Sequence, residues 1–443
     1  MGMLCRYSTL FLVASILACL LSAAGPVGGE YVLADISLGN WSVPLVINDR
    51  GQIAGIYQSR IGAYQFFFWD PVTGHQDMGF GPTSDLEITG INNTGQVAGH
   101  WKGDGFVWDQ LHGIRWLPKL TNETRASCRP QGINDSGYIV GGATSAQGNA
   151  HAVWWDLEGD IHDLGVYGYN WTDSYGINNR GQIVGAANLN GISHLLLWDG
   201  VGNLRDLGIP AGLVGVKPEV ITETCQIVGY IGTALNRNRY AFVWDVDNAF
   251  QLFLGTGGDS CAYDMNDRGQ IVGSCTSAGF IWQHGQVGYL GSLTENLNGG
   301  TIMSANGINN RGLICAVGRL RSNPDVKSFL LHPILGVAVD IRPGGSKPAP
   351  IDLKSHGKLP VGIYGSPEFN VLEILPETVT LAQTPARSWK VTDLDGDEIE
   401  DLLLHFSTQS LQIDANTQQV RLDGRTTHGQ YIRGFDYIKV VGQ

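Results

Sequence analysis

Four closely spaced aspartates near the end of the chain form the sharpest chemical motif in the sequence. The stretch DLDGDEIED follows the spacing of a calcium loop, with ligands expected from Asp393, Asp395, Asp397, the carbonyl of Ile399, and Asp401. Calcium prefers carboxylate and carbonyl oxygens, and alternate residues of a tight loop direct their side chains inward. Without a cation, so many carboxylates at this spacing would repel one another. We therefore expect a structural calcium site here.

The loop departs from the EF-hand pattern in two places. Glu398 stands where a turn glycine is usual, and Leu404 stands where a bidentate glutamate closes the EF-hand. The motif thus predicts a calcium loop of a β-domain, in which that last ligand is often missing. The alternative is an acidic turn that is simply solvated.

Aromatic side chains gather in a second stretch, GVYGYNWTDSYG, at 165–176. Tyr167, Tyr169, Trp171 and Tyr175 could stack on sugar rings or on the side chains of a protein partner. The alternative is that they fill gaps in the core, which is the commoner role of large aromatic residues. We take the four as candidate binding residues.

Known catalytic motifs are missing from the sequence. It has no Gly-x-Ser-x-Gly elbow, no His-Glu-x-x-His motif and no Gly-Lys-Ser/Thr phosphate loop. His151 and His194 lack the accompanying spacing of metal ligands, so we expect them to form hydrogen bonds at strand edges. No catalytic residue is assigned, and a non-catalytic role is favoured over an enzyme.

The first residues, 1–24, read as a signal peptide. A short basic start at Arg6 is followed by an apolar run over 10–21 and by the small residues of a cleavage site at 22–24. This pattern predicts a secreted, extracellular protein. The alternative is a surface lipoprotein, because Cys19 ends a weak lipoprotein box and could carry a lipid anchor.

Five cysteines follow the signal peptide, which is an odd number for an oxidising compartment. Cys261 and Cys275 flank one copy of a repeated turn almost symmetrically, so they could face each other across a hairpin and form a disulfide. The sequence suggests no partner for Cys128, Cys225 and Cys315.

The charge and the distribution of apolar residues argue against nucleic acid as a partner and against a membrane span after the signal peptide. The formal net charge is -13 and no cluster of Lys or Arg offsets it, which argues against nucleic acid. No apolar run after the signal peptide approaches the length of about 20 residues that a membrane span needs. Only 16% of the residues are charged and 61 are glycine, as expected of many short strands joined by tight turns.

A decapeptide that recurs seven times defines the architecture. In copies such as GINNRGQIVG, Asn and Asp side chains bond the local backbone of a tight hairpin, and Gly takes the left-handed position. The anchoring residues recur about every 44 residues, as in propeller blades; they are Asn48, Asn92, Asn134, Asn178, Thr222, Asn266 and Asn309. In the fifth copy Cys225 replaces the turn glycine, so we expect a distorted or weakened turn there.

Each hairpin is followed by an apolar strand that ends in Trp-Asp, as in LLLWD, and then by a fourth strand, as in LRDLG. Four strands per repeat predict a seven-bladed β-propeller over 30–334, whose seventh blade takes its last strand from YVLADISLG at 31–39. The hairpins followed by His-Ala-Val at 151–153 and His-Leu-Leu at 194–196 resemble the HAF-repeat family of extracellular bacterial proteins. That resemblance implies export and repetition but no reaction.

After the propeller the period stops, and 335–443 reads as the short strands of a small antiparallel β-sandwich. The stretches VDIRPG, LPVGIYGSPEFNV and GFDYIKVVG resemble a C-terminal module of bacterial secreted proteins that has no defined activity. The predicted fold class is therefore all-β, with the calcium loop in the second domain.

The leading functional hypothesis is a secreted binding or scaffold protein. It would recognise a glycan or a protein partner through the propeller face that carries the loops of variable length. The alternative is a propeller hydrolase or lyase of polysaccharides, which requires acidic or His residues to converge at one end of the channel with raised pKa values.

Overall fold

The computed structural model describes residues 30–59, 64–78, 85–200, 203–233, 238–252, 259–283 and 285–441. The chain forms two compact units that divide between Leu331 and His332, a few residues before the predicted boundary. The predicted signal peptide, with Cys19, lies outside the described residues. Within them, the helices are all too short or too polar to span a membrane.

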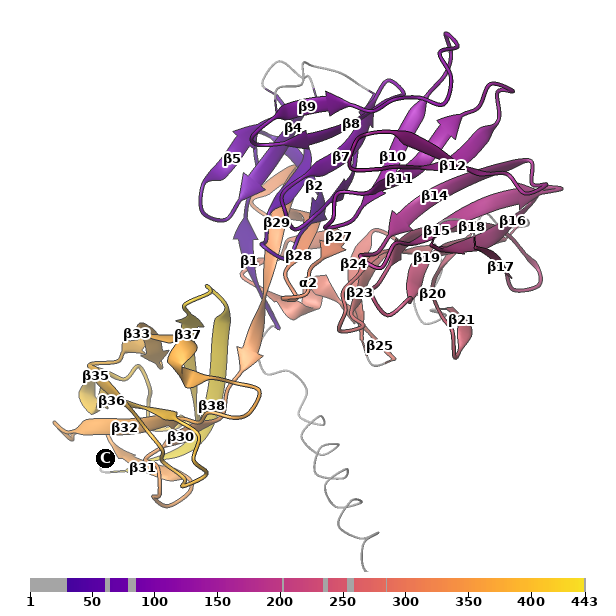
Figure 1. The fold of residues 1–443 in the computed structure, drawn as a ribbon. Coiled ribbons are helices and arrows are strands. Elements are labelled where there is room, and N and C mark those ends of the chain that lie inside the picture. Colours follow the sequence, from indigo (N-terminus) through magenta and orange to yellow (C-terminus); the bar gives the residue numbers. More distant parts are fainter. Residues whose placement is uncertain are drawn as a thin grey trace, which may run out of the picture. The chain divides into compact units, whose positions relative to one another are not determined.

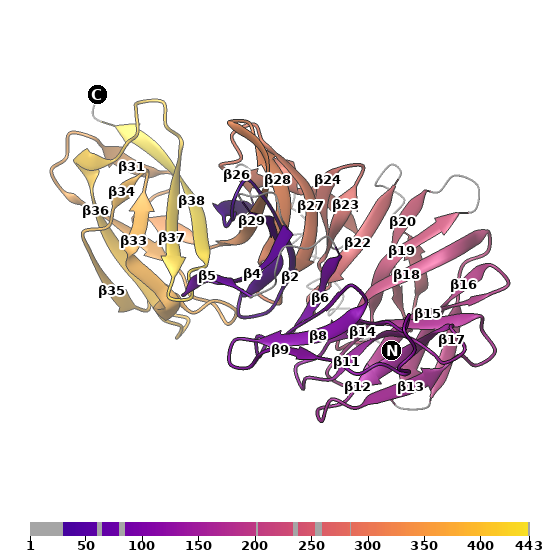
Figure 2. The ribbon, with the colours of Figure 1, turned by 90° about the horizontal axis from the view of Figure 1, so that it is seen from above.

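The first unit is a propeller of seven four-stranded blades (Figures 1 and 2). Blade 1 contains, from the channel outward, β2 (Trp41–Ile47), β3 (Ile53–Gln58), β4 (Tyr64–Asp70) and β5 (Gly74–Asp77). The third strand of a blade is apolar on both sides, as in the buried Phe66, Phe67 and Phe68 of β4. This follows because neighbouring blades cover both faces of each sheet.

The next five blades repeat this order. Blade 2 contains β6 (Leu86–Ile91), β7 (Val97–Trp101), β8 (Asp104–Asp109) and β9 (Gly113–Trp116). Blade 3 contains β10 (Cys128–Ile133), β11 (Ile139–Thr144), β12 (Ala150–Trp155) and β13 (Ile161–Gly165). Blade 4 contains β14 (Trp171–Ile177), β15 (Gln182–Leu189), β16 (Ile192–Asp199) and β17 (Leu204–Gly208). Blade 5 contains β18 (Leu213–Ile221), β19 (Ile227–Thr233), β20 (Arg239–Asp245) and β21 (Ala249–Leu252). Blade 6 contains β22 (Ser260–Met265), β23 (Ile271–Cys275), β24 (Ala278–Gln283) and β25 (Gln286–Tyr289).

Blade 7 joins the two ends of the propeller, and α2 (Leu290–Leu293) and β26 (Thr294–Glu295) lead into it. Its strands β27 (Thr301–Ile308), β28 (Ile314–Leu320) and β29 (Asn323–Gly336) follow the sixth blade, whereas its fourth strand is β1 (Tyr31–Asp35), beside which the two-residue β26 pairs in parallel. The N–H of Ile36 donates to the carbonyl of Ser328 at 3.1 Å. The predicted closure by the segment 31–39 is therefore confirmed, and it pairs an edge that would otherwise stay open.

A ring of hydrogen bonds surrounds the channel at the end where the repeated turns lie. The side-chain amide of an anchoring Asn donates to the carbonyl of the next anchor, as from Asn48 to Asn92 and from Asn309 back to Asn48, both at 2.9 Å. A second series of hydrogen bonds links the residues that follow the anchors in six of the seven steps among the described residues, and in one of them the N–H of Asn310 donates to Asp49 Oδ1 at 2.8 Å. The contacts between the seventh and first copies show a closed circle of repeats.

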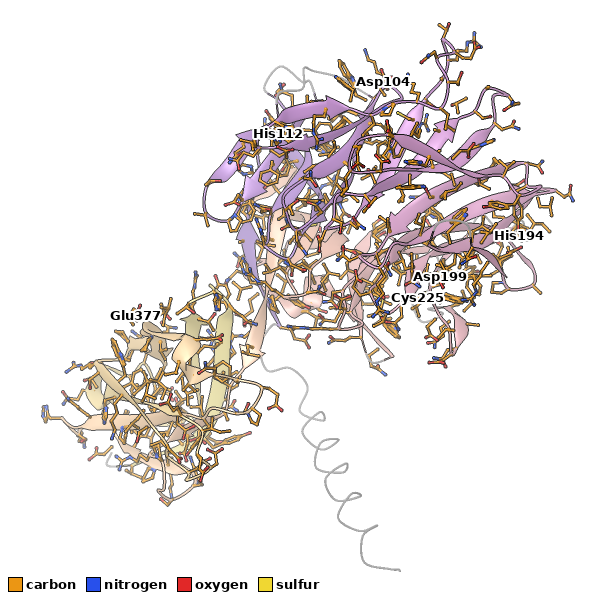
Figure 3. The ribbon with its side chains drawn as sticks, viewed as in Figure 1. Asp104, His112, His194, Asp199, Cys225 and Glu377 are labelled. Carbon is orange, nitrogen blue, oxygen red and sulfur yellow. The ribbon has the colours of Figure 1, made fainter. Side chains whose placement is uncertain are left out.

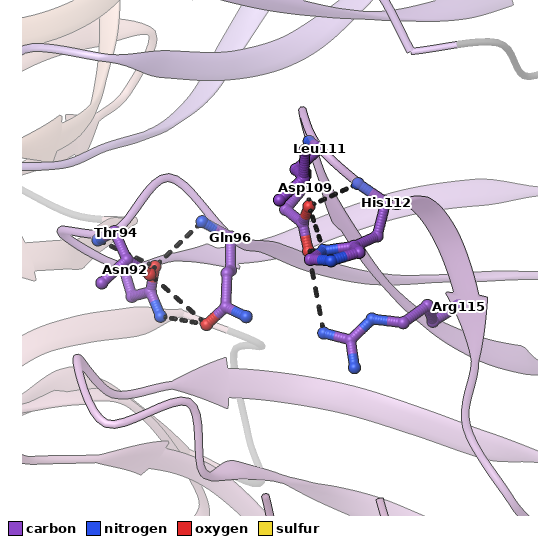
Figure 4. Close-up of polar contacts among 7 residues, drawn as sticks. All are labelled: Asn92, Thr94, Gln96, Asp109, Leu111, His112 and Arg115. Carbon is purple, nitrogen blue, oxygen red and sulfur yellow. Dashed lines mark hydrogen bonds and ion pairs between the residues drawn. The ribbon is translucent and has the colours of Figure 1, made fainter.

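The polar residues of the repeat cap its two turns (Figure 4). Asn92 Oδ1 accepts from the N–H of Gln96 at 2.9 Å, and Asn92 Nδ2 donates to Gln96 Oε1 at 2.8 Å. At the Trp-Asp turn, Asp109 Oδ1 accepts from the N–H groups of Leu111 and His112 at 3.0 and 2.7 Å. These side chains satisfy amides that a tight hairpin leaves unpaired, so their recurrence is structural.

The fifth copy keeps its turn without the glycine. Cys225, labelled in Figure 3, takes a φ of 62° itself, and its N–H donates to the carbonyl of Thr222 at 3.0 Å. The predicted distortion is therefore wrong, and the replacement leaves only the strain of a side chain at positive φ. Because Thr222 has no side-chain amide, the described residues lack the ring hydrogen bond to the carbonyl of Asn266.

The second unit packs two sheets on a common core that includes Leu404, Phe406 and Leu422. One sheet contains β30 (Val339–Ile341), β32 (Lys358–Ile363), β36 (Asp401–Ser407) and β35 (Ser388–Thr392). The other contains the end of β29, β38 (Tyr431–Val441), β37 (Gln419–Thr426), β33 (Ile374–Leu381), β34 (Thr384–Pro385) and, beside β38, β31 (Ala349–Asp352). Two 3-10 turns, η2 (Val371–Glu373) and η3 (Thr408–Ser410), connect strands. The predicted β-sandwich is confirmed, except that β29 and β31 pair with β38 in parallel.

Candidate functional site

Every innermost strand of the propeller has a bulged residue three positions before the anchoring residue of its turn, and β18 and β27 each have a second register shift nearer their start. The register of β6 against β7 pairs Ile88 with Gly99 and Gly90 with Ala98, so Thr89 has no partner. The same shift occurs at the equivalent position in the other six blades. A bulge re-aims the extra side chain. The bulged residues all line one cavity of about 520 Å³; they are Leu45, Thr89, Gln131, Tyr175, Glu219, Tyr263 and Asn306.

In the first six copies the last glycine of the repeated motif allows the two innermost strands to approach closely beside the bulge, whereas the seventh copy has Ala316 there. A Cβ on Gly99 would lie 2.3 Å from the carbonyl oxygen of Glu87, and one on Gly185 would lie 2.2 Å from that of Asp173. In these blades the two backbones approach so closely that only glycine fits. The repeated pattern explains the turn glycine, but this second requirement, and with it the bulge, was not predicted.

The bulged residues differ in chemistry from blade to blade, although the strands that carry them are repeated. Only Leu45 is apolar, and the other six carry hydrogen-bonding groups. Four of these six already bond other residues of the propeller. Thr89 Oγ1 donates to the carbonyl of Pro130 at 2.9 Å, and Asn306 Nδ2 donates to that of Pro44 at 2.7 Å. The hydroxyl of Tyr263 lies 2.9 Å from Ser274 Oγ, and Glu219 accepts from Lys217. The amide of Gln131 forms no hydrogen bond with another described residue. Its donors and acceptor therefore remain available in the cavity.

Charged side chains alternate two positions earlier on the innermost strands of blades 2 to 5. We refer to these four as the charged arc; they are Glu87, Arg129, Asp173 and Lys217. The equivalent residues of the other three blades carry no formal charge; they are Cys261, Ser304 and Val43. Glu87 and Lys217 line the same cavity as the bulged residues. A hydrogen bond from His100, whose Nε2 lies 3.2 Å from Glu87 Oε2, lowers the pKa of Glu87.

Asp173 is the acid of the arc whose environment is least favourable to its charge. Its side chain lies against Gly142 of blade 3, where a Cβ would come within 2.5 Å of Asp173 Oδ1. This Oδ1 is buried and has no hydrogen-bond partner among the described residues. Burial raises the pKa of Asp173 to about 7, although Arg129 and Lys217 oppose the shift. The carboxyl is therefore half protonated near neutral pH.

Lys217 is occupied by an ion pair within its own strand. Its Nζ lies 2.7 and 2.8 Å from the two carboxylate oxygens of Glu219, and 5.6 Å from the ring centre of Tyr175. Burial opposes the charge of Lys217, but Glu219 outweighs this effect and the pKa of Lys217 is raised. In contrast, Arg129 is exposed and forms no ion pair with another described residue. The arc thus contains one engaged cation and one available cation.

The four aromatic residues predicted to bind a ligand lie in different surroundings. Tyr175 lines the cavity, whereas Trp171 packs against the core between blades 4 and 5. The hydroxyl of Tyr169 donates to Asp206 Oδ2 at 2.7 Å, and Tyr167 is 54% exposed. The structure therefore does not bring the four into one site, and only Tyr175 belongs to the channel.

The two recurring histidines form hydrogen bonds within their blades. His151 Nδ1 lies 2.8 Å from Asp163 Oδ2, and His194 Nδ1, labelled in Figure 3, lies 2.8 Å from Asp206 Oδ2. Both aspartates belong to the outermost strand of the same blade. This matches the interpretation of the histidines as strand-edge residues.

The predicted Cys261–Cys275 disulfide is wrong. Neither cysteine takes part in a disulfide, and both are buried, like Cys128 and Cys315. The strand register pairs Cys261 with Ser274 and Ser260 with Cys275. Adjacent residues of a strand project from opposite faces, so the two sulfurs point away from each other.

In the second unit, the structure brings together three of the predicted calcium ligands. One carboxylate oxygen from each of Asp393, Asp395 and Asp401 lies within 4.8 Å of the others. Asp397 is outside this group, and its Oδ1 accepts from the N–H of Ile399 at 2.8 Å. Asp401 is buried and its two oxygens accept from two backbone N–H groups, at 2.8 and 2.7 Å, so its orientation is fixed.

Comparison with known proteins gives likeness of fold only. No protein-family model matches the chain, and no curated protein matches it. Among solved structures, virginiamycin B lyase from Staphylococcus aureus is 12% identical, over 68% of this chain and 99% of its own, with a TM-score of 0.45. A puromycin hydrolase is 10% identical over 78% and 63%, with a TM-score of 0.43, and YCF48 bound to D1 peptide is 10% identical over 69% and 98%, with a TM-score of 0.41. The HAF-repeat resemblance stays a prediction.

Proposed function

We propose that the chain is a binding protein that takes a polar group of a glycan or protein partner into its channel. One observation carries this proposal. In six of the seven blades the bulged residue has a hydrogen-bonding side chain, and its type varies although the strands that carry it are repeated. A position that only filled the channel would be apolar in every blade, as it is at Leu45. The cavity, at about 520 Å³, has the size of typical small-ligand sites.

Gln131 offers the sharpest test because nothing in the described scaffold uses its amide. We would screen the labelled full chain on an array of defined oligosaccharides and secreted-protein peptides, and measure each hit by calorimetry. Gln131→Ala should weaken binding at least tenfold without changing the circular dichroism spectrum. Gln110→Ala, in an exposed Trp-Asp turn, is the matched control and should bind normally. Hits that are insensitive to Gln131→Ala, or an array without hits, would contradict a channel site.

A polysaccharide hydrolase or lyase is the second candidate function. It is favoured by Asp173, because a pKa of about 7 suits a general acid or base near neutral pH. Each polysaccharide that binds would be incubated with the protein and assayed for new reducing ends and for unsaturated products. Turnover that falls at least a hundredfold in Asp173→Ala, with binding retained, would support an enzyme. Binding without turnover leaves the first function.

For the second unit we propose a structural calcium ion. Three carboxylates within 4.8 Å of one another offer the hard oxygen ligands that calcium prefers, with carbonyls or water completing the shell. Asp393, Asp395 and Asp401 would hold the ion, and secretion, proposed from the sequence, would expose it to millimolar calcium. The expected effect is to stiffen the loop between β35 and β36.

A further inference from the structure

Arg129 and Asp173 approach the same point from neighbouring blades. The register of β10 and β11 places Arg129 opposite Gly142, so both residues project from one face of blade 3. The space beside Gly142 on that face holds the carboxyl of Asp173 from blade 4. The charge of Arg129 also acts on the pKa values of both Asp173 and Glu87. An available guanidinium and a carboxyl with an unpartnered oxygen therefore lie on the same side of blade 3, without forming an ion pair with each other.

The other groups around Asp173 are neutral or already paired. On β18, Lys217 is held by Glu219, and Tyr175 is the other titratable residue close by on β14 itself. The strands β11, β12 and β15 face β14 with small or apolar residues; these are Gly142, Ala152, Val153 and Ala186. On β6, Glu87 is bonded to His100. Arg129 is thus the cation that can accept a new anion.

We propose that Arg129 and Asp173 together bind the carboxylate of a hexuronate residue. A planar guanidinium matches a carboxylate with two parallel hydrogen bonds. Asp173 in its protonated form donates a third hydrogen bond to the ligand, whereas in its ionised form it repels the ligand. The sugar hydroxyls meet the available amide of Gln131 in the cavity. They can also donate to the hydroxyl oxygens of Thr89 and Tyr263, which already bond Pro130 and Ser274. This inference rests on the proposed binding function and names its ligand class.

In the proposed complex the carboxyl of Asp173 and the carboxylate of the uronate share one proton, so the affinity for the uronate depends on pH. Burial places the pKa of Asp173 at about 7 in the free protein. If only the protonated form binds, affinity should fall about tenfold between pH 6 and pH 8. Asp173→Asn should abolish this dependence and still bind at pH 8, because the amide donates a hydrogen bond at every pH.

The test measures binding of glucuronate and galacturonate by calorimetry at both pH values, with glucose and galactose as neutral probes and N-acetylglutamate as a carboxylate without a sugar. Arg129→Gln should lose at least tenfold in uronate affinity, whereas the control variant Gln110→Ala, in an exposed Trp-Asp turn, should bind uronates as the parent does.

Three outcomes would overturn the inference. Neutral sugars that bind as well as uronates, with Arg129→Gln unaffected, would refute the carboxylate site and leave the proposed channel function intact. N-acetylglutamate binding as tightly as the uronates would refute the sugar class. If neither uronate binds, the inference is refuted as well. The proposed binding function is refuted only if the oligosaccharide and peptide array also gives no hits.

Discussion

Replacing Asp173 by Asn should change how the stability of the propeller depends on pH. Burial raises the pKa of this carboxyl from 3.8 to about 7 in the folded protein. The folded state therefore holds the proton more tightly than the unfolded chain does. The resulting stabilisation is complete below about pH 4 and is lost as the pH rises through 7.

The size of the effect follows from the two pKa values. The full shift corresponds to roughly 4 kcal/mol of unfolding free energy. Part of this is already lost below pH 5, so the loss between pH 5 and pH 8 is about 2.6 kcal/mol. Asp264, whose pKa burial also raises to about 7, is present in both proteins, so its contribution cancels in the comparison.

Urea unfolding at pH 5 and pH 8 measures this difference. Eleven of the 12 tryptophans precede His332, so tryptophan fluorescence reports mainly on the propeller. The parent should lose about 2.6 kcal/mol more than Asp173→Asn between the two pH values. Glu87→Gln is the control, because the pKa of Glu87 is lowered and the group stays ionised over this range. Equal losses in the parent and in Asp173→Asn would refute the account of Asp173 as a buried titrating acid.

Three further changes test other parts of the structure. Gly142→Ala should destabilise the propeller by about 2 kcal/mol in urea unfolding, because its Cβ would overlap Asp173. The control Gly215→Ala has open space around its Cβ and should change the stability by less than about 0.5 kcal/mol. Similar values for the two variants would contradict the close contact between Gly142 and Asp173. Thr222→Asn should complete the ring of hydrogen bonds and raise the free energy of unfolding by about 1 kcal/mol in the same assay, and a neutral or destabilising result would show that the ring adds nothing at this step. Calcium at a hundredfold excess over its Kd should stabilise the second unit by about 2.7 kcal/mol in calorimetric melting. EDTA and Asp395→Asn should remove this stabilisation, whereas Asp397→Asn should keep it. Stabilisation that survives Asp395→Asn would place the ion elsewhere.

The blades and their closure could be predicted because they depend on local patterns. The turn of each repeat is specified by Asn, Gly and the flanking apolar residues, and Asn48 to Asn309 mark it seven times. The segment 31–39 matches the fourth strand of a blade, so its place beside β29 followed from the count of strands. Only the turn at Cys225 differed, because a cysteine can take the left-handed conformation at moderate cost.

The site could not be predicted, because it depends on a register shift that the local pattern does not reveal. A hairpin without a bulge would place Cys261 opposite Cys275, which is why a disulfide was expected. The bulge at Tyr263 moves the partner of Cys261 to Ser274. The same shift turns Tyr175 and Glu219 into the channel. A signal was present nonetheless, since the residues five positions before the anchors alternate in charge from Glu87 to Lys217.

The strand that seals the ring also dictates the order in which the molecule can be completed. Ser37 and Ser328, which bond across this seam, are 291 residues apart. During synthesis β1 emerges first and must wait, without its partner, until the last repeat has been made. Joining such distant segments is slow, so the final step of folding is a late docking event that brings the beginning of the chain to its newest part.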